Sequence, residues 1–148
     1  TFSVLAAAIS GGLEEAINLG REGLKIYPAE PTILVNAGAV LDQKGDHEAA
    51  EQFFLRAISS GSEVPPQAHK NLGDQALRRG DRGGARTHYE QAVKLNPDLG
   101  DDTYLKLGQI ALEELDRELA IIFFQRSLEL NPQNNDARSR LEDLSALP

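Results

Sequence analysis

Residues 71–97 read NLGDQALRRGDRGGARTHYEQAVKLNP, and the landmarks of this stretch recur along the chain at a nearly constant step. Successive copies lie 34 or 35 residues apart. The positions that keep the step are Ala16, Ala50, Ala85 and Ala120; Gly38, Gly73 and Gly108; and Asp46, Asp81 and Asp116. A fixed period of this length is the signature of a repeat architecture, in which each period is one supersecondary unit.

Each period has the pattern of a helix, a turn and a second helix. The first segment carries apolar or small residues at helical spacing, and so does the second. Between them, Gly45 fits a residue that ends a helix at positive φ, and Asp46 offers an oxygen to cap the next helix. A proline that follows asparagine then closes the second helix. The helical positions in one period are Leu34, Ala37, Gly38 and Leu41, then Ala50, Phe53, Phe54, Ala57 and Ile58.

These features resemble the tetratricopeptide repeat family. The shared marks are a Leu-Gly pair in the first helix, a central alanine, an aromatic residue four positions later and the closing proline. The resemblance implies an all-α, right-handed superhelix of about three and a half antiparallel helix pairs. The residues that carry it are Leu72-Gly73 and Leu107-Gly108, the aromatics Phe54, Tyr89 and Phe124, and the small residues Ala57, Ala92 and Ser127.

The same register divides the chain, treated as one domain, into repeats. A partial first repeat is expected over 1–28, and full repeats over 31–64, 66–97 and 101–132. Residues 134–148 carry one apolar stripe, which favours a capping helix, with a docking helix as the alternative. The truncated first repeat and the lack of an initiator Met favour a piece of a longer chain.

Composition excludes several classes of function. The 148 residues have a net charge of −8 and no basic run, which disfavours binding to nucleic acid. No apolar run approaches the roughly 18 residues that a membrane span needs. Cysteine is absent, so disulfides, thiolate catalysis and Cys-ligated metals are excluded. The sequence names no compartment.

No residue pattern predicts catalysis, a cofactor or a metal site. The three histidines, His47, His69 and His88, lack metal-ligand spacing, and His69 stands at an aromatic packing position of its repeat. The glycine-dense stretch 80–84 has neither phosphate-binding order and follows a helix instead of a strand. We therefore expect a protein that is not an enzyme.

The remaining candidate is a surface. In stacked helical hairpins the first helix of each repeat lines the concave face, and its exposed stripe can be found by helical spacing. This places an apolar patch at one end of the predicted groove and mixed polar residues along the rest. The stripe consists of Phe2, Leu5 and Ile9; Asn36, Ala39 and Gln43; Asn71, Asp74 and Arg78; and Lys106, Gln109 and Glu113, with Lys70 at the rim.

Asn36 and Asn71 are informative because an amide both donates and accepts, and can therefore hold the main chain of an extended peptide. The family resemblance implies a similar role, since peptide-binding members often place asparagine here. Asp102 stands where the family's carboxylate clamp needs a cation, which disfavours capture of a chaperone's C-terminus. Alternatively, Arg78 and Glu113 simply pair with each other.

The leading hypothesis is a non-catalytic scaffold or adaptor that binds a protein or peptide partner. The first alternative is a homodimer formed through the apolar patch of the incomplete first repeat. The second is the regulatory part of a larger enzyme.

Overall fold

The computed structural model describes residues 30–61 and 63–146, and every regular element within these ranges is an α-helix. The prediction of an all-α fold is therefore confirmed. The partial first repeat and its residues Phe2, Leu5 and Ile9 lie outside the described residues. The helices are α3 (Pro31–Lys44), α4 (His47–Ser59), α5 (Pro66–Arg78), α6 (Arg82–Leu95), α7 (Asp101–Glu113), α8 (Arg117–Leu130) and α9 (Asn135–Ala146).

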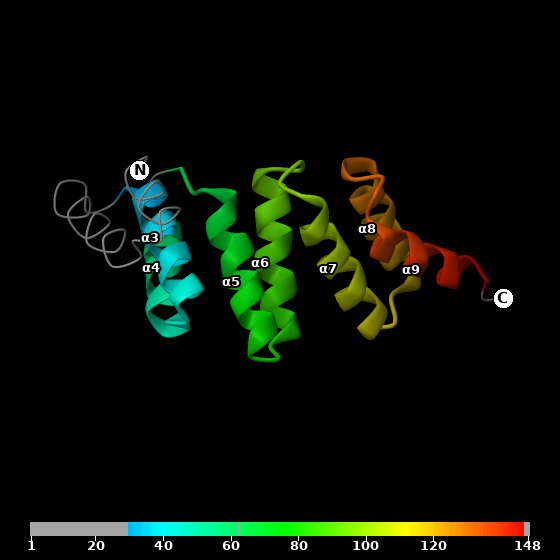
Figure 1. The fold of residues 1–148 in the computed structure, drawn as a ribbon, viewed down its shortest axis with the longest axis horizontal. Coiled ribbons are helices and arrows are strands. Elements are labelled where there is room, and N and C mark those ends of the chain that lie inside the picture. The colour runs from blue at the N-terminus through cyan, green and yellow to red at the C-terminus, as the bar shows by residue number, and fades with distance from the viewer. Residues whose placement is uncertain (1–29, 62, 147–148) are drawn as a thin grey trace.

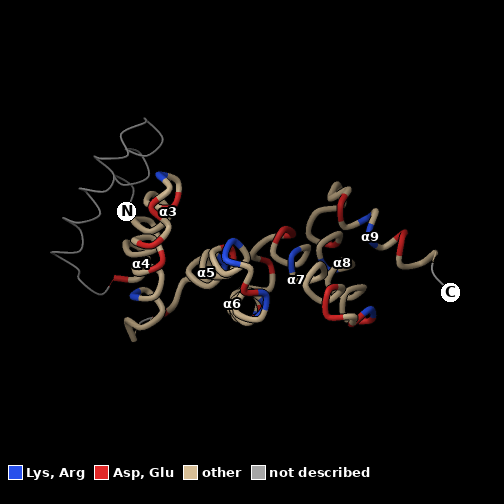
Figure 2. The backbone as a smooth tube through the Cα atoms, turned by 90° about the horizontal axis from the view of Figure 1, so that it is seen from below, with Lys and Arg blue, Asp and Glu red and all other residues tan. Residues whose placement is uncertain are grey.

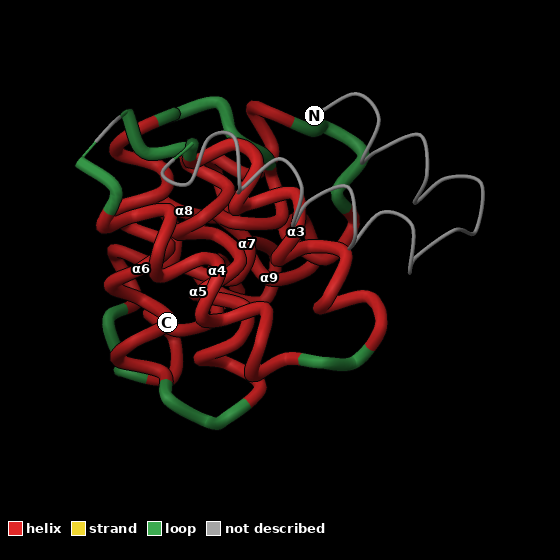
Figure 3. The backbone as a smooth tube through the Cα atoms, turned by 90° about the vertical axis from the view of Figure 1, so that its left-hand side faces the viewer, coloured by secondary structure: helices red, strands yellow, loops and turns green. Residues whose placement is uncertain are grey.

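The helices stack as antiparallel pairs. Each of α3–α4, α5–α6 and α7–α8 forms one pair, and the pairs follow one another along the long axis of the molecule (Figure 1). Seen from below, the stack is a shallow arc with α3, α5, α7 and α9 toward its inner side (Figure 2). Seen from the end, the helices overlap and loops lie at the periphery (Figure 3). The first helix of every pair therefore belongs to one inner layer.

Tight turns hold the two helices of each pair. Gly45 and Gly80 adopt φ of 90° and 77°, a left-handed conformation that glycine enters without steric cost. The following aspartates cap the next helices: the side chains of Asp46, Asp81 and Asp116 accept hydrogen bonds from the amides of Ala49, Gly84 and Leu119. The predicted turn and cap are thus confirmed.

Leu115 occupies the corresponding turn position of the last pair. Its φ is 65° and its side chain is 90% exposed, so it bears the cost of a left-handed backbone without any packing in return. Replacing Leu115 by glycine would relieve that strain. Part of the gain would be offset, because glycine has more conformational freedom in the unfolded chain.

We expect Leu115→Gly to raise the free energy of unfolding by up to about 1 kcal/mol. Leu115→Asn should give a smaller gain, because asparagine tolerates this conformation better than leucine does. Urea unfolding monitored by circular dichroism measures both. A loss of stability in Leu115→Gly would show that the turn is not strained.

Close approach within a pair depends on one glycine and one aromatic ring. A Cβ atom built on Gly38, Gly73 or Gly108 would lie 2.5–2.6 Å from the ring of Phe54, Tyr89 or Phe124, respectively. All three rings are completely buried. Because glycine has no side chain, the ring of the second helix can lie directly on the backbone of the first.

Helix α9 continues the inner layer. Its Ala137 and Leu144 are buried in the same cluster as Ala120 and Phe124 of α8. Most of its other side chains are exposed. One apolar stripe against the stack and a polar remainder are what a terminal capping helix requires.

Candidate functional site

The inner layer is hollowed around Gln109 of α7. A hollow of about 210 Å³ lies between α5 and α7, and two others of about 340 Å³ each lie on the α7–α9 side. Gln109 lines all three, so they adjoin one another and form a groove across α5, α7 and α9, which we call the inner groove. Its lining residues are Leu77, Gly80, Arg82, Lys106, Gln109, Ile110, Leu112, Glu113, Asp136, Ser139, Arg140 and Asp143.

The amides predicted for this surface lie on the first helix of each pair. Gln109 lines the inner groove, whereas Asn36, Gln43 and Asn71 are not among the residues that line its three hollows. Asn36, Asn71 and Gln109 are half-buried, and Gln43 is exposed near the end of α3. Within the part of the chain that the structure describes, none of these four side chains has a hydrogen-bond partner. Partly desolvated amides with open donors and acceptors are available to a ligand.

Lys106 and Asp74, which were both predicted to line the groove, bind each other. The ammonium group of Lys106 lies 2.5 Å from Asp74 Oδ1 and 5.7 Å from the centre of the Tyr89 ring. The hydroxyl group of Tyr89 donates a hydrogen bond to the same oxygen of Asp74, at 2.6 Å. Burial, together with the nearby Asp74 carboxylate, raises the pKa of Tyr89 well above its usual value. Asp74 therefore joins α5 to both α6 and α7.

Lys70 is engaged as well. Its ammonium group lies 2.8 Å from Asp102, whose carboxylate is also 3.8 Å from Lys106. Burial raises the pKa of Asp102, but the hydrogen bond and charge of Lys70 and the charge of Lys106 outweigh it, and the net pKa is lowered. Asp102 thus neutralises two lysines that could otherwise bind the C-terminal carboxylate of a peptide.

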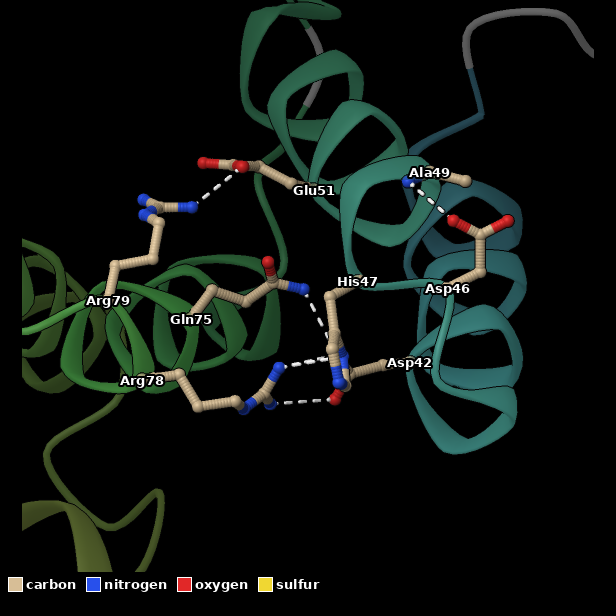
Figure 4. Close-up of polar contacts among 8 residues, drawn as sticks. All are labelled: Asp42, Asp46, His47, Ala49, Glu51, Gln75, Arg78 and Arg79. Carbon is tan, nitrogen blue, oxygen red and sulfur yellow. Dashed lines mark hydrogen bonds and ion pairs between the residues drawn. The ribbon is translucent and has the colours of Figure 1, made fainter.

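The alternative pairing of Arg78 with Glu113 is wrong. The guanidinium of Arg78 reaches backward from α5 to both carboxylate oxygens of Asp42 at 3.0 Å each (Figure 4). Glu113 instead pairs with Arg82. A flexible arginine can turn toward either neighbouring pair, and the two-point contact with Asp42 is the stronger arrangement.

Asp42 is the centre of a contact between neighbouring helix pairs. It also accepts a hydrogen bond from Gln75 at 3.1 Å and lies 2.7 Å from His47 Nδ1 (Figure 4). Burial raises the pKa of Asp42, but hydrogen bonds from Arg78 and His47 and their charges outweigh it and lower the net pKa. These contacts tie α3 and α4 to α5.

A separate hollow of about 450 Å³ lies at this junction, between α4 and α5. Arg79 and Glu51, which both line it, form an ion pair with an N–O distance of 2.7 Å; the pair is drawn in Figure 4. Both arginines at its wall are therefore held by acids. The lining residues are His47, Glu48, Glu51, Gln75, Arg78 and Arg79.

The sequence-based prediction missed the contribution of α9 to the inner groove. Asp136, Ser139, Arg140 and Asp143 line its last hollow with Gln109. Arg140 has no ion-pair partner among the described residues. Extending the repeat register from α7 to α9 by 34 residues would have predicted these positions. In that register Lys106 corresponds to Arg140, and the buried Ile110 corresponds to the buried Leu144.

Neither a metal-ion cluster nor a membrane-spanning helix occurs in the described ranges. These ranges contain no group of three or more His, Cys, Asp or Glu side chains placed to hold a metal ion. None of their helices combines the length and apolar character required to cross a membrane.

The fold is similar to several solved structures. MamA matches with a TM-score of 0.78 at 19% identity, covering 94% of this chain and 80% of that one. YrrB, described as a TPR protein with an unusual peptide-binding site, matches with 0.78 at 21%, covering 97% and 73%. PilF of Pseudomonas aeruginosa matches with 0.78 at 21%, covering 95% and 64%. At such identities the likeness concerns the fold alone.

A sequence comparison with curated proteins gave no match. Two family models, each described as tetratricopeptide repeat, do match the chain. One covers residues 66–99, and the other covers 31–60 and 101–134. Together they span more than half of the 148 residues and coincide with the three helix pairs. The chain therefore belongs to the tetratricopeptide repeat family.

Proposed function

We propose that this chain is a non-catalytic interaction module whose inner groove, together with the inner face of α5 that carries Asn71, holds an extended peptide segment of a partner protein by its main chain. Repeats of this family are in general protein-interaction modules. The observation that carries the proposal is the contrast in the inner layer: the predicted amides have no hydrogen-bond partner among the described residues, whereas the lysines and arginine predicted there are paired.

This contrast favours a particular kind of ligand. A paired cation must lose its acid before it can bind a charged group, and that exchange gains little. An amide without a partner can instead give one donor and one acceptor to a peptide main chain at no such cost. The peptide-binding site ascribed to the similarly folded YrrB supports the same use of the fold.

We expect that 10–12-residue peptides selected by display against the chain will lose affinity when the amides are removed. Each of Asn71→Ala and Gln109→Ala should weaken binding by about two- to tenfold, the value of one lost hydrogen bond. Raising the salt from about 0.1 M to about 0.5 M should change the dissociation constant by less than about twofold, because two of the three lining cations, Arg82 and Lys106, are paired and only Arg140 lacks an ion-pair partner among the described residues. Isothermal titration calorimetry measures both effects.

The matched controls are Gln52→Ala and Gln125→Ala, which remove exposed amides from the outer helices α4 and α8. They should leave affinity unchanged. Equal losses in the outer and inner variants, or binding that no inner variant weakens, would remove the groove from consideration. A strong loss at high salt would point to charge recognition instead.

A further inference from the structure

Two histidines meet between the helices of the third repeat. Nδ1 of His69 on α5 lies 3.1 Å from Nδ1 of His88 on α6, and both residues are half-buried. Their ring centroids are 5.4 Å apart, close to the largest separation that this Nδ1 distance permits. The two nitrogens therefore point straight at each other. This is the geometry of an N–H···N hydrogen bond, and not of two ligands that converge on a metal ion.

The other helix pairs have apolar side chains at these positions. In the next repeat, 35 residues after His69 and His88, these positions hold Tyr104 and Phe123, whose rings pack with centroids 6.3 Å apart. In the preceding repeat, 35 residues earlier, they hold the buried Leu34 and the half-buried Phe53, which belong to one apolar cluster. The third repeat thus replaces an apolar contact between its two helices with a titratable one.

Proton counting limits the charge that this contact can hold. In the neutral pair one ring donates its Nδ1–H and the other accepts at Nδ1. A first added proton can bind Nε2 of the donor ring, which leaves the hydrogen bond intact. A second must bind Nδ1 of the acceptor ring, and it both breaks the bond and places two cations in contact.

The charged groups around the pair do not remove this limit. Glu51 of α4 and Asp81 of the α5–α6 turn act on His88 and favour its protonation, while Arg79 opposes it. Glu51 is already bound to Arg79, and Asp81 caps α6. Burial lowers the pKa of both histidines, and the charge of His88 lowers the pKa of His69 further.

We propose that the His69–His88 contact is a pH-sensitive lock between α5 and α6, which opens in acid and loosens the helix that carries Asn71 and Asp74. The proposal concerns the folded repeat itself and does not depend on what the inner groove binds. The open state can bind a proton that the closed state cannot. The population of the open state is therefore low above the ordinary histidine pKa of about 6.5 and increases below it.

Amide hydrogen exchange of the whole chain at about pH 7.5 and about pH 5, corrected for intrinsic rates, tests the lock. We expect the opening equilibrium constant of residues 66–95 to increase as the pH falls below about 6.5. The limiting increase is about tenfold per pH unit for each proton that only the open state binds. Residues 101–130 of the same molecule should change much less, because their contact is Tyr104–Phe123.

The decisive variant is His69→Tyr with His88→Phe, which installs the contact of the fourth repeat in the third. It should abolish the difference in pH dependence between 66–95 and 101–130. His88→Gln, which removes one titrating ring with less change in packing, should reduce it. His47→Gln removes the remaining histidine and should leave the difference unchanged. The lock is refuted if 66–95 opens no more than 101–130 in the unaltered chain, or if the His69/His88 variants retain its pH dependence.

Discussion

Replacing Phe124 by alanine should lower the free energy of unfolding by about 3–5 kcal/mol, the cost of deleting a large buried ring and leaving a cavity. Phe124 is fully buried, lies on Gly108, and belongs to the same core cluster as Ala111 of α7 and Ala137 and Leu144 of α9. The loss therefore affects the fourth repeat and its contact with the capping helix at once. Urea unfolding monitored by circular dichroism measures it.

Because repeats contact mainly their neighbours, the damage should be graded along the chain. Hydrogen exchange should increase most in 101–146 and least in α3. Ile122→Ala is the control, since Ile122 lies on the same helix but is 57% exposed. It should cost less than about 1 kcal/mol. Similar losses in both variants would contradict the assignment of Phe124 to the core.

Gly108→Ala is expected to destabilise the protein by about 2–3 kcal/mol, although alanine is the better helix former. The added Cβ would lie 2.5 Å from Phe124 Cε1 and 2.7 Å from Cδ1, and the ring is completely buried, so it can give way only by displacing other core side chains. The steric cost must therefore exceed the roughly 1 kcal/mol that alanine gains in a helix. Chemical denaturation provides the measurement.

Gly83→Ala is the matched control. Its Cβ would meet no atom closer than 3.9 Å, so the helix preference of alanine should act alone and raise stability by up to about 1 kcal/mol. In the Phe124→Ala background, Gly108→Ala should lose most of its cost, because the ring it collides with is gone. Equal costs of Gly108→Ala with and without the ring would show that the close approach is not what requires glycine.

The sequence predicted the helix pairs because their determinants are local and repeated. Gly45 and Asp46 end one helix and start the next through their own backbone and side-chain chemistry, and the same pair returns at Gly80 and Asp81. The packing of Gly73 beneath an aromatic ring follows from the same register. Features of this kind need no knowledge of how one repeat is placed against the next.

The polar contacts between repeats could not be predicted in this way. Arg78 has an acid one repeat away in each direction, and only the placement of the helices decides that it binds Asp42 and not Glu113. The meeting of His69 with His88 also depends on the orientation of side chains 19 residues apart. On α9 the apolar stripe was found, but not the polar side that completes the inner groove.

We propose that a peptide is bound through side-chain amides of the inner groove and of the adjacent inner face of α5, and nuclear magnetic resonance can observe those groups directly. A ¹⁵N-labelled chain would be titrated with a display-selected peptide while the side-chain NH₂ signals of asparagine and glutamine are followed. We expect the signals of Asn71 and Gln109 to shift with peptide concentration while those of Gln52, Gln91 and Gln125 on the outer helices stay in place. Shifts confined to the outer helices, or to Gln75 in the α4–α5 hollow, would contradict it.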